Sequence, residues 1–274
     1  MTVVTLTTDF GSADGYVGTM KGVILSIAPQ AQLVDLSHHI PPQDVRRAAL
    51  LLAAAAPFFP PQTVHLAVVD PGVGTGRRAM ALRTPQGTFV GPDNGLFGYV
   101  LAEAVEWTAV ELTEPPGRPA RVSDTFHGRD LFAPAAAHLA CGAPLESLGP
   151  PLHNPLTLPL PRLEVGPRTV TGEVLYADRF GNLVTSVGRL EWEGEWLRLA
   201  PAFRRAPTSL RLPTTARVEL GGRTIHTIRH TYGEVGEGDL LALVGSDGFL
   251  EVALRQGDAA ARLGVGAGAV VVRW

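Results

Sequence analysis

Short apolar runs, each followed at once by a polar residue, recur through the first half of the chain. Runs of this length between helical patterns are typical of buried parallel strands. Ligands of open α/β sheets bind outside the carboxyl ends of the strands, so we expect the polar residues at those ends to gather in one site. The alternative is that each of them only begins a turn. The four runs are Val3–Thr8 before Asp9, Leu33–Leu36 before Ser37, His38 and His39, Val64–Val69 before Asp70, and Phe89–Gly91 before Asp93 and Asn94.

Segments with helical periodicity alternate with these runs. One of them ends at Pro29, and another ends at Gly142, a common residue type just beyond a helix. Cys141, the single cysteine, falls in the latter and is expected to be buried as a small hydrophobe. The predicted helices are one bearing Val17, Met20, Ile24 and Ile27 on one face, one over Gln43–Ala56, one that starts near Asn94 as its N-cap, and one that starts near Asp130 and ends at Gly142.

The pattern changes in the middle of the chain. The prolines between Pro150 and Pro167 interrupt any periodicity and predict an extended, semi-rigid linker. Beyond them, short alternating runs such as Thr169–Tyr176 predict strands, and the pair Gly221-Gly222 predicts a hairpin. The sequence therefore predicts two domains, an α/β domain with a mostly parallel sheet over residues 1–150 and a small barrel or sandwich over residues 168–274.

Charge and cysteine content exclude several classes of function. The net charge of −3 gives no reason to expect a nucleic acid or a membrane surface as a partner. One cysteine excludes an intrachain disulfide and a multi-cysteine metal site. No apolar run reaches membrane-spanning length, and Met1 leads into a predicted strand without a secretory leader, so the cytoplasm is the expected location.

The densest group of candidate residues lies at Asp70, which precedes a turn with three glycines and then Arg77 and Arg78. Glycines let a backbone approach a ligand closely, and a nearby arginine holds a carboxylate ionised. A glycine turn with a surface ion pair would look the same. A second group is Thr125–Asp130, where His127 precedes a predicted helix and could act as a general base near neutral pH. A lone histidine is more often structural.

Two further segments are candidates for binding a nucleoside. Asp9 could accept both hydroxyls of a ribose, although neither a G-x-G-x-x-G turn nor a Walker motif accompanies it. In the second half, Asp178 begins a tight turn and could pair with an ammonium group. In the same turn Phe180 could stack on a base and Asn182 could bind its edge. An ordinary hairpin loop could contain the same residues.

Together these segments resemble the S-adenosylmethionine-dependent hydroxide adenosyltransferases, which are relatives of the fluorinases and chlorinases. The resemblance implies an N-terminal α/β domain, a C-terminal β-barrel domain, and a homotrimer with active sites between neighbouring subunits. It extends over nearly the whole chain, through Thr7–Gly18, Val69–Arg78, Gly91–Gly95, Phe126–Ala137, Asp178–Asn182 and Ser246–Ala259.

By motif position, the resemblance implies that Asp70, Arg77 and His127 activate water, with Arg78 as the alternative to Arg77. The halogenating relatives have a tyrosine where Asp70 stands, and the fluorinases have a serine where Gly128 stands and a loop insertion that is not found here. A charged Asp70 would repel a halide but could orient water. The substrate-binding residues implied by the resemblance are Asp9, Asn94, Asp178, Phe180, Asn182, Tyr232, Ser246 and Ala259.

We therefore expect hydrolysis of S-adenosyl-L-methionine to adenosine and L-methionine, by attack of water or hydroxide on the ribose 5′ carbon and without a metal or other cofactor. Three alternatives remain: an S-adenosylmethionine-dependent halogenase, a metallohydrolase, and a module that senses adenosine or S-adenosylmethionine without turnover. A sensor without turnover would not need a general base such as His127. A metallohydrolase is disfavoured because the sequence has neither an H-x-x-H nor an H-x-H spacing. The metal ligands of a metallohydrolase would be His38, His39, Asp70, Asp93 and His127.

Overall fold

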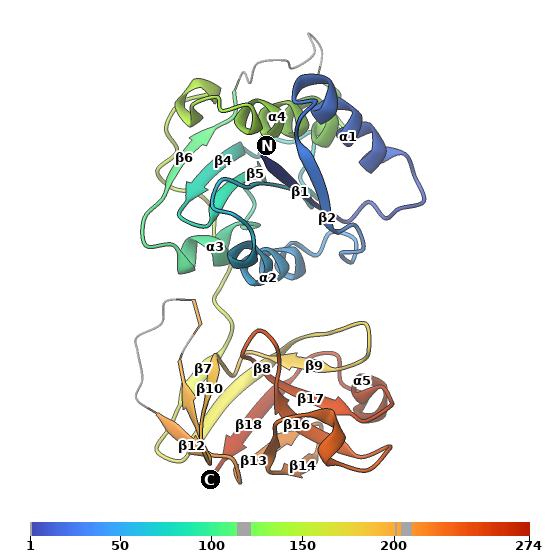
Figure 1. Cartoon of the computed structure of the whole chain (residues 1–274), viewed down its shortest axis with the longest axis vertical. Helices are drawn as coiled ribbons and strands as arrows, with labels where there is room; N and C mark the ends of the chain where they lie inside the picture. Colours follow the sequence, from blue (N-terminus) through green and yellow to red (C-terminus); the bar gives the residue numbers. More distant parts are fainter. Residues whose placement is uncertain (1, 114–121, 201, 204–209) are drawn as a thin grey trace. The chain divides into compact units, whose positions relative to one another are not determined.

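The chain folds into two compact units, Met1–Leu158 and Pro159–Trp274, each with its own hydrophobic core (Figure 1). The structure is a computed structural model that describes residues 2–113, 122–200, 202–203 and 210–274. Within those residues, no helix has the length and apolar character needed to cross a membrane.

The first unit is built around a six-stranded sheet. Its strands are β1 (Val3–Thr8), β2 (Gln32–Ser37), β3 (Val64–Val68), β4 (Ala79–Thr84), β5 (Gly87–Pro92) and β6 (Thr108–Glu111). The spatial order is β2-β1-β3-β5-β4-β6. The four strands predicted from the apolar runs pair in parallel, whereas β4 and β6 add an antiparallel edge that the sequence did not predict.

The order of these strands reverses beside β1. The chain adds β2 on one side of β1 and then crosses over to add β3 on the other side. The carboxyl ends of β1 and β3 therefore flank a reversal point, which is where open α/β sheets bind their ligands.

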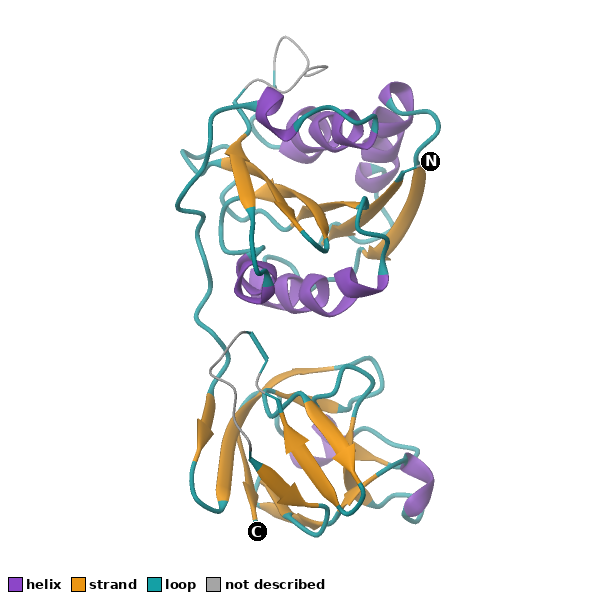
Figure 2. Cartoon of the chain, turned by 60° about the vertical axis from the view of Figure 1, so that its left-hand side comes forward, coloured by secondary structure: helices purple, strands orange, loops and turns teal. Residues whose placement is uncertain are grey.

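Helices cover both faces of this sheet (Figure 2). One pair packs together on one face and the other pair on the opposite face (Figure 1). The first pair is α1 (Tyr16–Ile27) with α4 (Ala133–Ala140), and the second is α2 (Val45–Ala55) with α3 (Gly98–Glu103). Short turns complete the unit: η1 (Ala56–Phe58), the π-helical η2 (Gly128–Phe132) and η3 (Leu145–Leu148). The buried residues of α1 include Val17, Met20 and Ile24, which belong to the predicted apolar face.

Two details of the helical prediction are wrong, the role of Asn94 and the burial of Cys141. Asn94 is not a helix N-cap, because α3 begins only at Gly98, and its Oδ1 instead accepts the N–H of Leu96 in a turn at 3.2 Å. The fourth helix, predicted to start near Asp130, begins with the π-helical turn η2 and continues as α4 from Ala133. Cys141 is exposed, because it is the C-cap of α4 and lies beyond the last buried turn of that helix.

The proline-rich segment after residue 149 is fastened to the first unit. Asp93 has a fully buried side chain that accepts the N–H of Leu156 at 2.7 Å and pairs with Arg78 at 2.6 Å. Arg78 also donates to the side-chain and backbone oxygens of Asn154, at 2.9 and 2.8 Å. This part of the predicted linker is therefore held in place.

The second unit is a nearly closed, barrel-like sheet with a smaller three-stranded sheet. The larger sheet has the order β14-β13-β18-β8-β9-β17-β16-β15, with β7 on β8, and the smaller has the order β10-β11-β12. β14 and β15 are the two end strands of the larger sheet and only one residue separates them in the chain, so the sheet is nearly closed. The predicted hairpin joins β13 to β14, and its two glycines have positive φ angles of 58° and 72°.

The elements of the second unit are short. Its strands are β7 (Leu163–Val165), β8 (Thr169–Ala177), β9 (Leu183–Thr185), β10 (Leu190–Glu193), β11 (Trp196–Leu199), β12 (Arg211–Pro213), β13 (Arg217–Leu220), β14 (Arg223–His226), β15 (Ile228–Arg229), β16 (Leu240–Val244), β17 (Leu250–Leu254) and β18 (Ala269–Arg273). Its helical elements are η4 (Tyr232–Glu234) and α5 (Ala259–Leu263).

Candidate active site

A cavity of about 340 Å³ opens in the first unit, where the strand order reverses between β1 and β3. Asp9 follows β1, Asp70 follows β3 after one residue, and both line the cavity. His127 lines it from the loop that precedes η2. The structure thus brings three of the sequence-predicted residues into one space, although the first and the last of them lie more than a hundred residues apart in the chain.

Asp70, Arg77 and His127 form a continuous hydrogen-bonded chain. The Nε of Arg77 donates to both carboxylate oxygens of Asp70, at 2.9 and 3.1 Å, and one terminal nitrogen of Arg77 also bonds this carboxylate. The same terminal nitrogen lies 2.7 Å from Nδ1 of His127. The Asp70 and Arg77 side chains are only 5% and 10% exposed, so this ion pair is shielded from solvent.

The geometry distinguishes the two arginines that the sequence could not separate. Arg77 bonds Asp70 and His127, and its guanidinium lies 5.2 Å from the centre of the Phe132 ring. Arg78 points elsewhere and is committed to Asp93, as described above. Arg77 is therefore the arginine that holds Asp70 and His127, two residues that line the cavity.

The environment of His127 favours its neutral form. Burial is the main cause that lowers its pKa below the ordinary value, and the positive charge of Arg77 lowers it further. Negative charges on Asp70 and Asp124 act in the opposite direction but do not outweigh these effects. A neutral histidine beside an ion pair can form a hydrogen bond with a bound water without adding a further charge.

Two backbone contacts position the loop that carries His127. Gly74 has a positive φ of 74°, and a Cβ built on it would lie 2.5 Å from the carbonyl oxygen of Asp124. The turn after Asp70 therefore packs directly against the loop before His127. From the other side, the Asp130 carboxylate accepts the N–H of Ser123 at 2.8 Å, which closes this loop.

Asp9 and a group of aromatic rings form the opposite wall. Asp9 accepts the N–H of Gln43 through one oxygen at 2.8 Å, and its other oxygen has no bond within the described chain. Phe10, Tyr16 and Phe126 pack against one another with centroid distances of 5.1 to 6.1 Å. Phe10, Gln43 and Phe126 line the cavity. Sequence analysis did not single them out, although Phe10 and Phe126 directly adjoin Asp9 and His127.

The position of Gly128 leaves little space for a side chain. A Cβ there would lie 3.1 Å from Sδ of Met20 and 3.3 Å from the ring of Phe126. A serine at this position would need Met20 or the aromatic wall to move.

Asn94 does not line this cavity, and of the five metal candidates only Asp70 and His127 line it, whereas His38, His39 and Asp93 do not. Both polar atoms of the Asn94 side-chain amide bond backbone atoms: Nδ2 donates to the carbonyl of Val69 at 2.9 Å, and Oδ1 accepts the N–H of Leu96. His38 bonds Thr8 at 2.9 Å and lies 3.0 Å from Asp35. Among the described residues, no group of three or more histidine, cysteine or acidic side chains is arranged to hold a metal ion.

The remaining candidates lie in the second unit. Asp178 accepts the backbone N–H groups of Phe180 and Asn182 through one oxygen and the side-chain amide of Asn182 through the other, at 2.8 to 3.0 Å. This amide also lies 3.5 Å from the hydroxyl of Tyr232. Phe180 as a whole residue is 75% exposed, as expected of a side chain available for stacking.

The start of α5 packs against this turn. The N–H of Ala260 donates to the carbonyl of Gly181 at 3.0 Å, and Asp258 lies directly against Gly181. Ala259 is fully buried, so only its backbone is available to a ligand. Ser246 is exposed in the turn between β16 and β17.

Glu251 links these residues and was not identified from the sequence. Its carboxylate accepts the Tyr232 hydroxyl at 3.4 Å and lies against Gly245, the neighbour of Ser246. Burial is the main cause that raises the pKa of Glu251, and the nearby Asp178 raises it further. The sequence signal that could have identified Glu251 is that it is an acidic residue within the otherwise apolar strand β17. The hydrogen-bonded chain thus runs from Asp178 through Asn182 and Tyr232 to Glu251.

Comparison with known proteins covers both units. Residues 4–149 and 172–272 match the models of the N-terminal and C-terminal domains of the SAM hydroxide adenosyltransferases. An (R)-S-adenosyl-L-methionine hydrolase of Thermus thermophilus is 46% identical over 94% of this chain and 93% of its own length. One from Salinispora tropica is 44% identical over 96% and 94%. A fluorinase of an Actinoplanes species is 30% identical over 70% and 73%.

Solved structures agree over the full length of the chain. A crystal structure of a conserved protein from Thermotoga maritima matches all of both chains, with a TM-score of 0.85 and 33% identity. Another, from Thermus thermophilus, matches all of both chains with a TM-score of 0.76 and 43% identity.

Proposed function

The chain belongs to the SAM hydroxide adenosyltransferase family, and from this premise we propose that it hydrolyses S-adenosyl-L-methionine to adenosine and L-methionine. The hydrolases of this substrate named above are similar to the chain over nearly its whole length. The observation that best supports the chemistry is the bonded chain of Asp70, Arg77 and His127, whose two ends, Asp70 and His127, line the cavity of the first unit.

In the proposed reaction, the oxygen of a water molecule attacks the ribose 5′ carbon while the bond from this carbon to sulfur breaks. The electron pair of the broken bond stays on sulfur, so methionine leaves as a neutral thioether and needs no acid. The enzyme must hold the water in line and remove one of its protons. We assign the proton to the Asp70 carboxylate, which passes it on to solvent.

His127 has a holding role in this proposal. A guanidinium can only donate hydrogen bonds, so Nδ1 of His127 accepts from Arg77 and carries no proton. The neutral ring then has its proton on Nε2, and this N–H can donate to the oxygen of the water. The lowered pKa of His127 keeps the ring neutral at the pH of the reaction.

The other candidates are proposed to bind substrate. Asp9 offers its unengaged oxygen to the ribose hydroxyls. Asp178 would meet the ammonium group of the methionine part, and Phe180 and Asn182 would contact the adenine. Tyr232, Ser246 and the backbone of Ala259 complete this set. Asn94 would act indirectly, by holding the end of β3 through the carbonyl of Val69.

The direct test is incubation with S-adenosyl-L-methionine and chromatography for adenosine. We expect turnover, and we expect Asp70→Asn and His127→Ala to lose about 10²-fold or more in kcat while they still bind adenosine. His39→Ala and Glu146→Gln alter exposed residues outside the cavity and serve as matched controls. Wild-type rates in both Asp70 and His127 variants would contradict the assignment.

The same assay separates the alternatives. Turnover that needs fluoride or chloride would indicate a halogenase, and turnover lost on chelation and restored by a metal would indicate a metallohydrolase. Binding of adenosine without turnover would indicate a sensor. A location in the cytoplasm remains a prediction from the sequence.

We propose a homotrimer in which the second set of binding residues comes from a neighbouring subunit. Mixing Asp70→Asn with Asn182→Ala, each inactive alone, should then restore some activity, because some interfaces would combine two intact sets. A fully active monomer by light scattering, without complementation, would contradict the shared site and leave the chemistry standing.

A further inference from the structure

A second cavity, of about 410 Å³, lies in the second unit and is lined by β14, the start of β16 and α5. Its lining carries Arg223, Arg229, Arg262 and His226 against a single carboxylate, Asp239. None of the residues proposed to bind substrate lines this cavity. A cluster of cations therefore occurs in a chain whose net charge is −3, and the proposed function does not use it.

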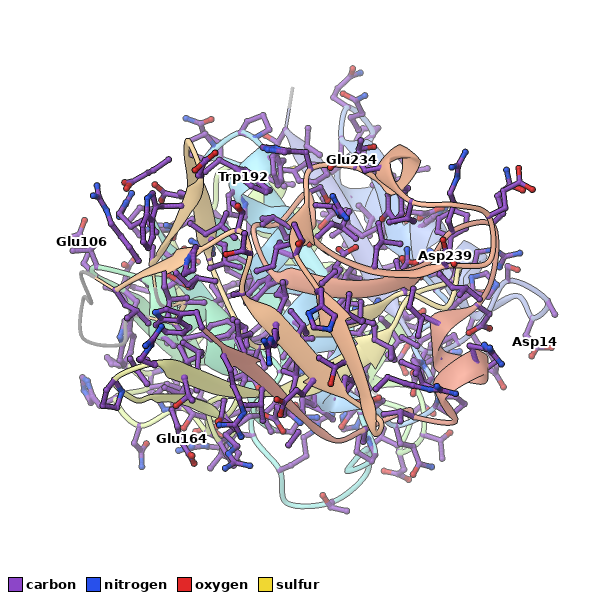
Figure 3. The ribbon with its side chains drawn as sticks, turned by 90° about the horizontal axis from the view of Figure 1, so that it is seen from below. Asp14, Glu106, Glu164, Trp192, Glu234 and Asp239 are labelled. Carbon is purple, nitrogen blue, oxygen red and sulfur yellow. The ribbon has the colours of Figure 1, made fainter. Side chains whose placement is uncertain are left out.

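Two of the three arginines in this cavity are not neutralised. Arg229 faces Glu234 at 3.9 Å, but neither Arg223 nor Arg262 has a carboxylate partner in the described part of the chain. Asp239 and Glu234, both labelled in Figure 3, belong to the loop between β15 and β16. The Asp239 carboxylate accepts the N–H of Gly236 at 3.0 Å and is thereby held by its own loop.

The rest of the lining combines hydrogen-bond donors with an apolar floor. β14 is the last strand in the order of its sheet, so one edge of its backbone has no strand partner in the described chain. Ile225 and Leu241 also line the cavity, are buried, and give it an apolar part, which we call the apolar floor. Guanidinium groups bind phosphate oxygens through paired hydrogen bonds, and two separated arginines suit a ligand with more than one phosphate.

We propose that this cavity binds a compact organic polyphosphate. The phosphates engage Arg223 and Arg262, and the organic part rests on Ile225 and Leu241. A polyphosphate spreads its charge over several groups, and each group can meet one guanidinium. A single carboxylate could not reach both arginines in this way.

Isothermal titration calorimetry with cytidine triphosphate tests this proposal, because this nucleotide has no adenine to occupy the proposed substrate site. We expect saturable binding with one ligand per chain. Arg223→Ala and Arg262→Ala should each weaken it at least about tenfold. Inorganic tripolyphosphate should bind more weakly than the nucleotide, since it lacks a group for the apolar floor, and cytidine should not bind.

Arg168→Ala is the matched control, because Arg168 is an exposed arginine of the same unit outside the cavity. Equal weakening in all three variants would show general attraction to positive charge and overturn the proposal, as would the absence of saturable binding. Equal affinity for tripolyphosphate and cytidine triphosphate would overturn the role of the apolar floor. Circular dichroism shows whether each variant is folded. These outcomes do not depend on the proposed hydrolysis.

Discussion

Replacing Gly74 with alanine tests whether the turn after Asp70 sets the position of His127. The new Cβ would lie 2.5 Å from the carbonyl oxygen of Asp124, whereas ordinary contact begins at 3.4 Å. The loop before His127 must therefore retreat by roughly 0.9 Å, the difference between these distances. The residue also has a φ of 74°, and this left-handed conformation costs about 1–2 kcal/mol for a residue with a side chain.

A displacement of this size is large for catalysis. A misplacement of about 1 Å can cost about 10²-fold in rate, even when the substituted residue does not touch the substrate. We expect Gly74→Ala to lower kcat by up to about this factor. The KM for S-adenosyl-L-methionine should change much less, because the proposed binding residues are not displaced.

Gly76→Ala provides the control in the same turn. A Cβ at Gly76 meets no atom within 4 Å, and this residue does not have a positive φ. We expect near wild-type kinetics from it. Steady-state kinetics of both variants, with circular dichroism to confirm folding, test whether the turn after Asp70 sets the position of His127. A folded Gly74→Ala enzyme with the wild-type kcat would refute the reasoning.

Three further predictions concern pH, the ribose and the second unit. His65 is fully buried, bonds Thr5 at 2.8 Å and stacks on Phe89, and burial lowers its pKa to about 4 from 6.5. In the unfolded state His65 therefore binds a proton below about pH 6.5. In the folded state His65 binds this proton only below about pH 4. This residue should lower the free energy of unfolding by about 3 kcal/mol as the pH falls through this window, at about 1.36 kcal/mol per unit of pKa. In urea unfolding at pH 7, 5.5 and 4, His65→Phe should lose this part of the pH dependence, and an unchanged dependence would contradict the role of burial. Asp9→Ala should weaken adenosine binding by about 1–3 kcal/mol in calorimetry, because the ribose hydroxyls lose an acceptor, and an unchanged affinity would exclude this role. Glu251→Gln should raise the KM for S-adenosyl-L-methionine with little change in kcat, since Glu251 acts through Tyr232, and the reverse pattern would place it near the chemistry instead.

Periodicity predicted the frame of the molecule and the neighbourhood of the cavity. Apolar runs located β1, β2, β3 and β5, and the parallel pairing of these strands carries Asp9 and Asp70 to neighbouring strand ends. The edge strands β4 and β6 were missed. β4 follows the glycine turn without a helix, so the alternation of strand and helix on which the prediction relied breaks there.

Side-chain partners could not be predicted from spacing. Arg77 and Arg78 are adjacent in the sequence, and only the fold sends one to Asp70 and the other to Asp93. Glu251 was missed for a related reason, because a single charged residue in a strand usually faces solvent, and its link to Tyr232 depends on a contact between separate segments. Cys141 was misplaced because composition around a residue does not show where a helix ends.

The clamp formed by Asp93, Arg78 and Asn154 determines where the chain can be cut. A fragment that stops at Gly149 would keep the buried Asp93 carboxylate but lose the N–H of Leu156 and both oxygens of Asn154. It would also uncover Gly95 and Gly98, against which Leu158 packs. A fragment that ends at Leu158 keeps all of these contacts. The first unit therefore keeps its contacts only when the proline-rich segment up to Leu158 is included. A fragment that ends at Gly149 would lack the partners of Asp93 and Arg78.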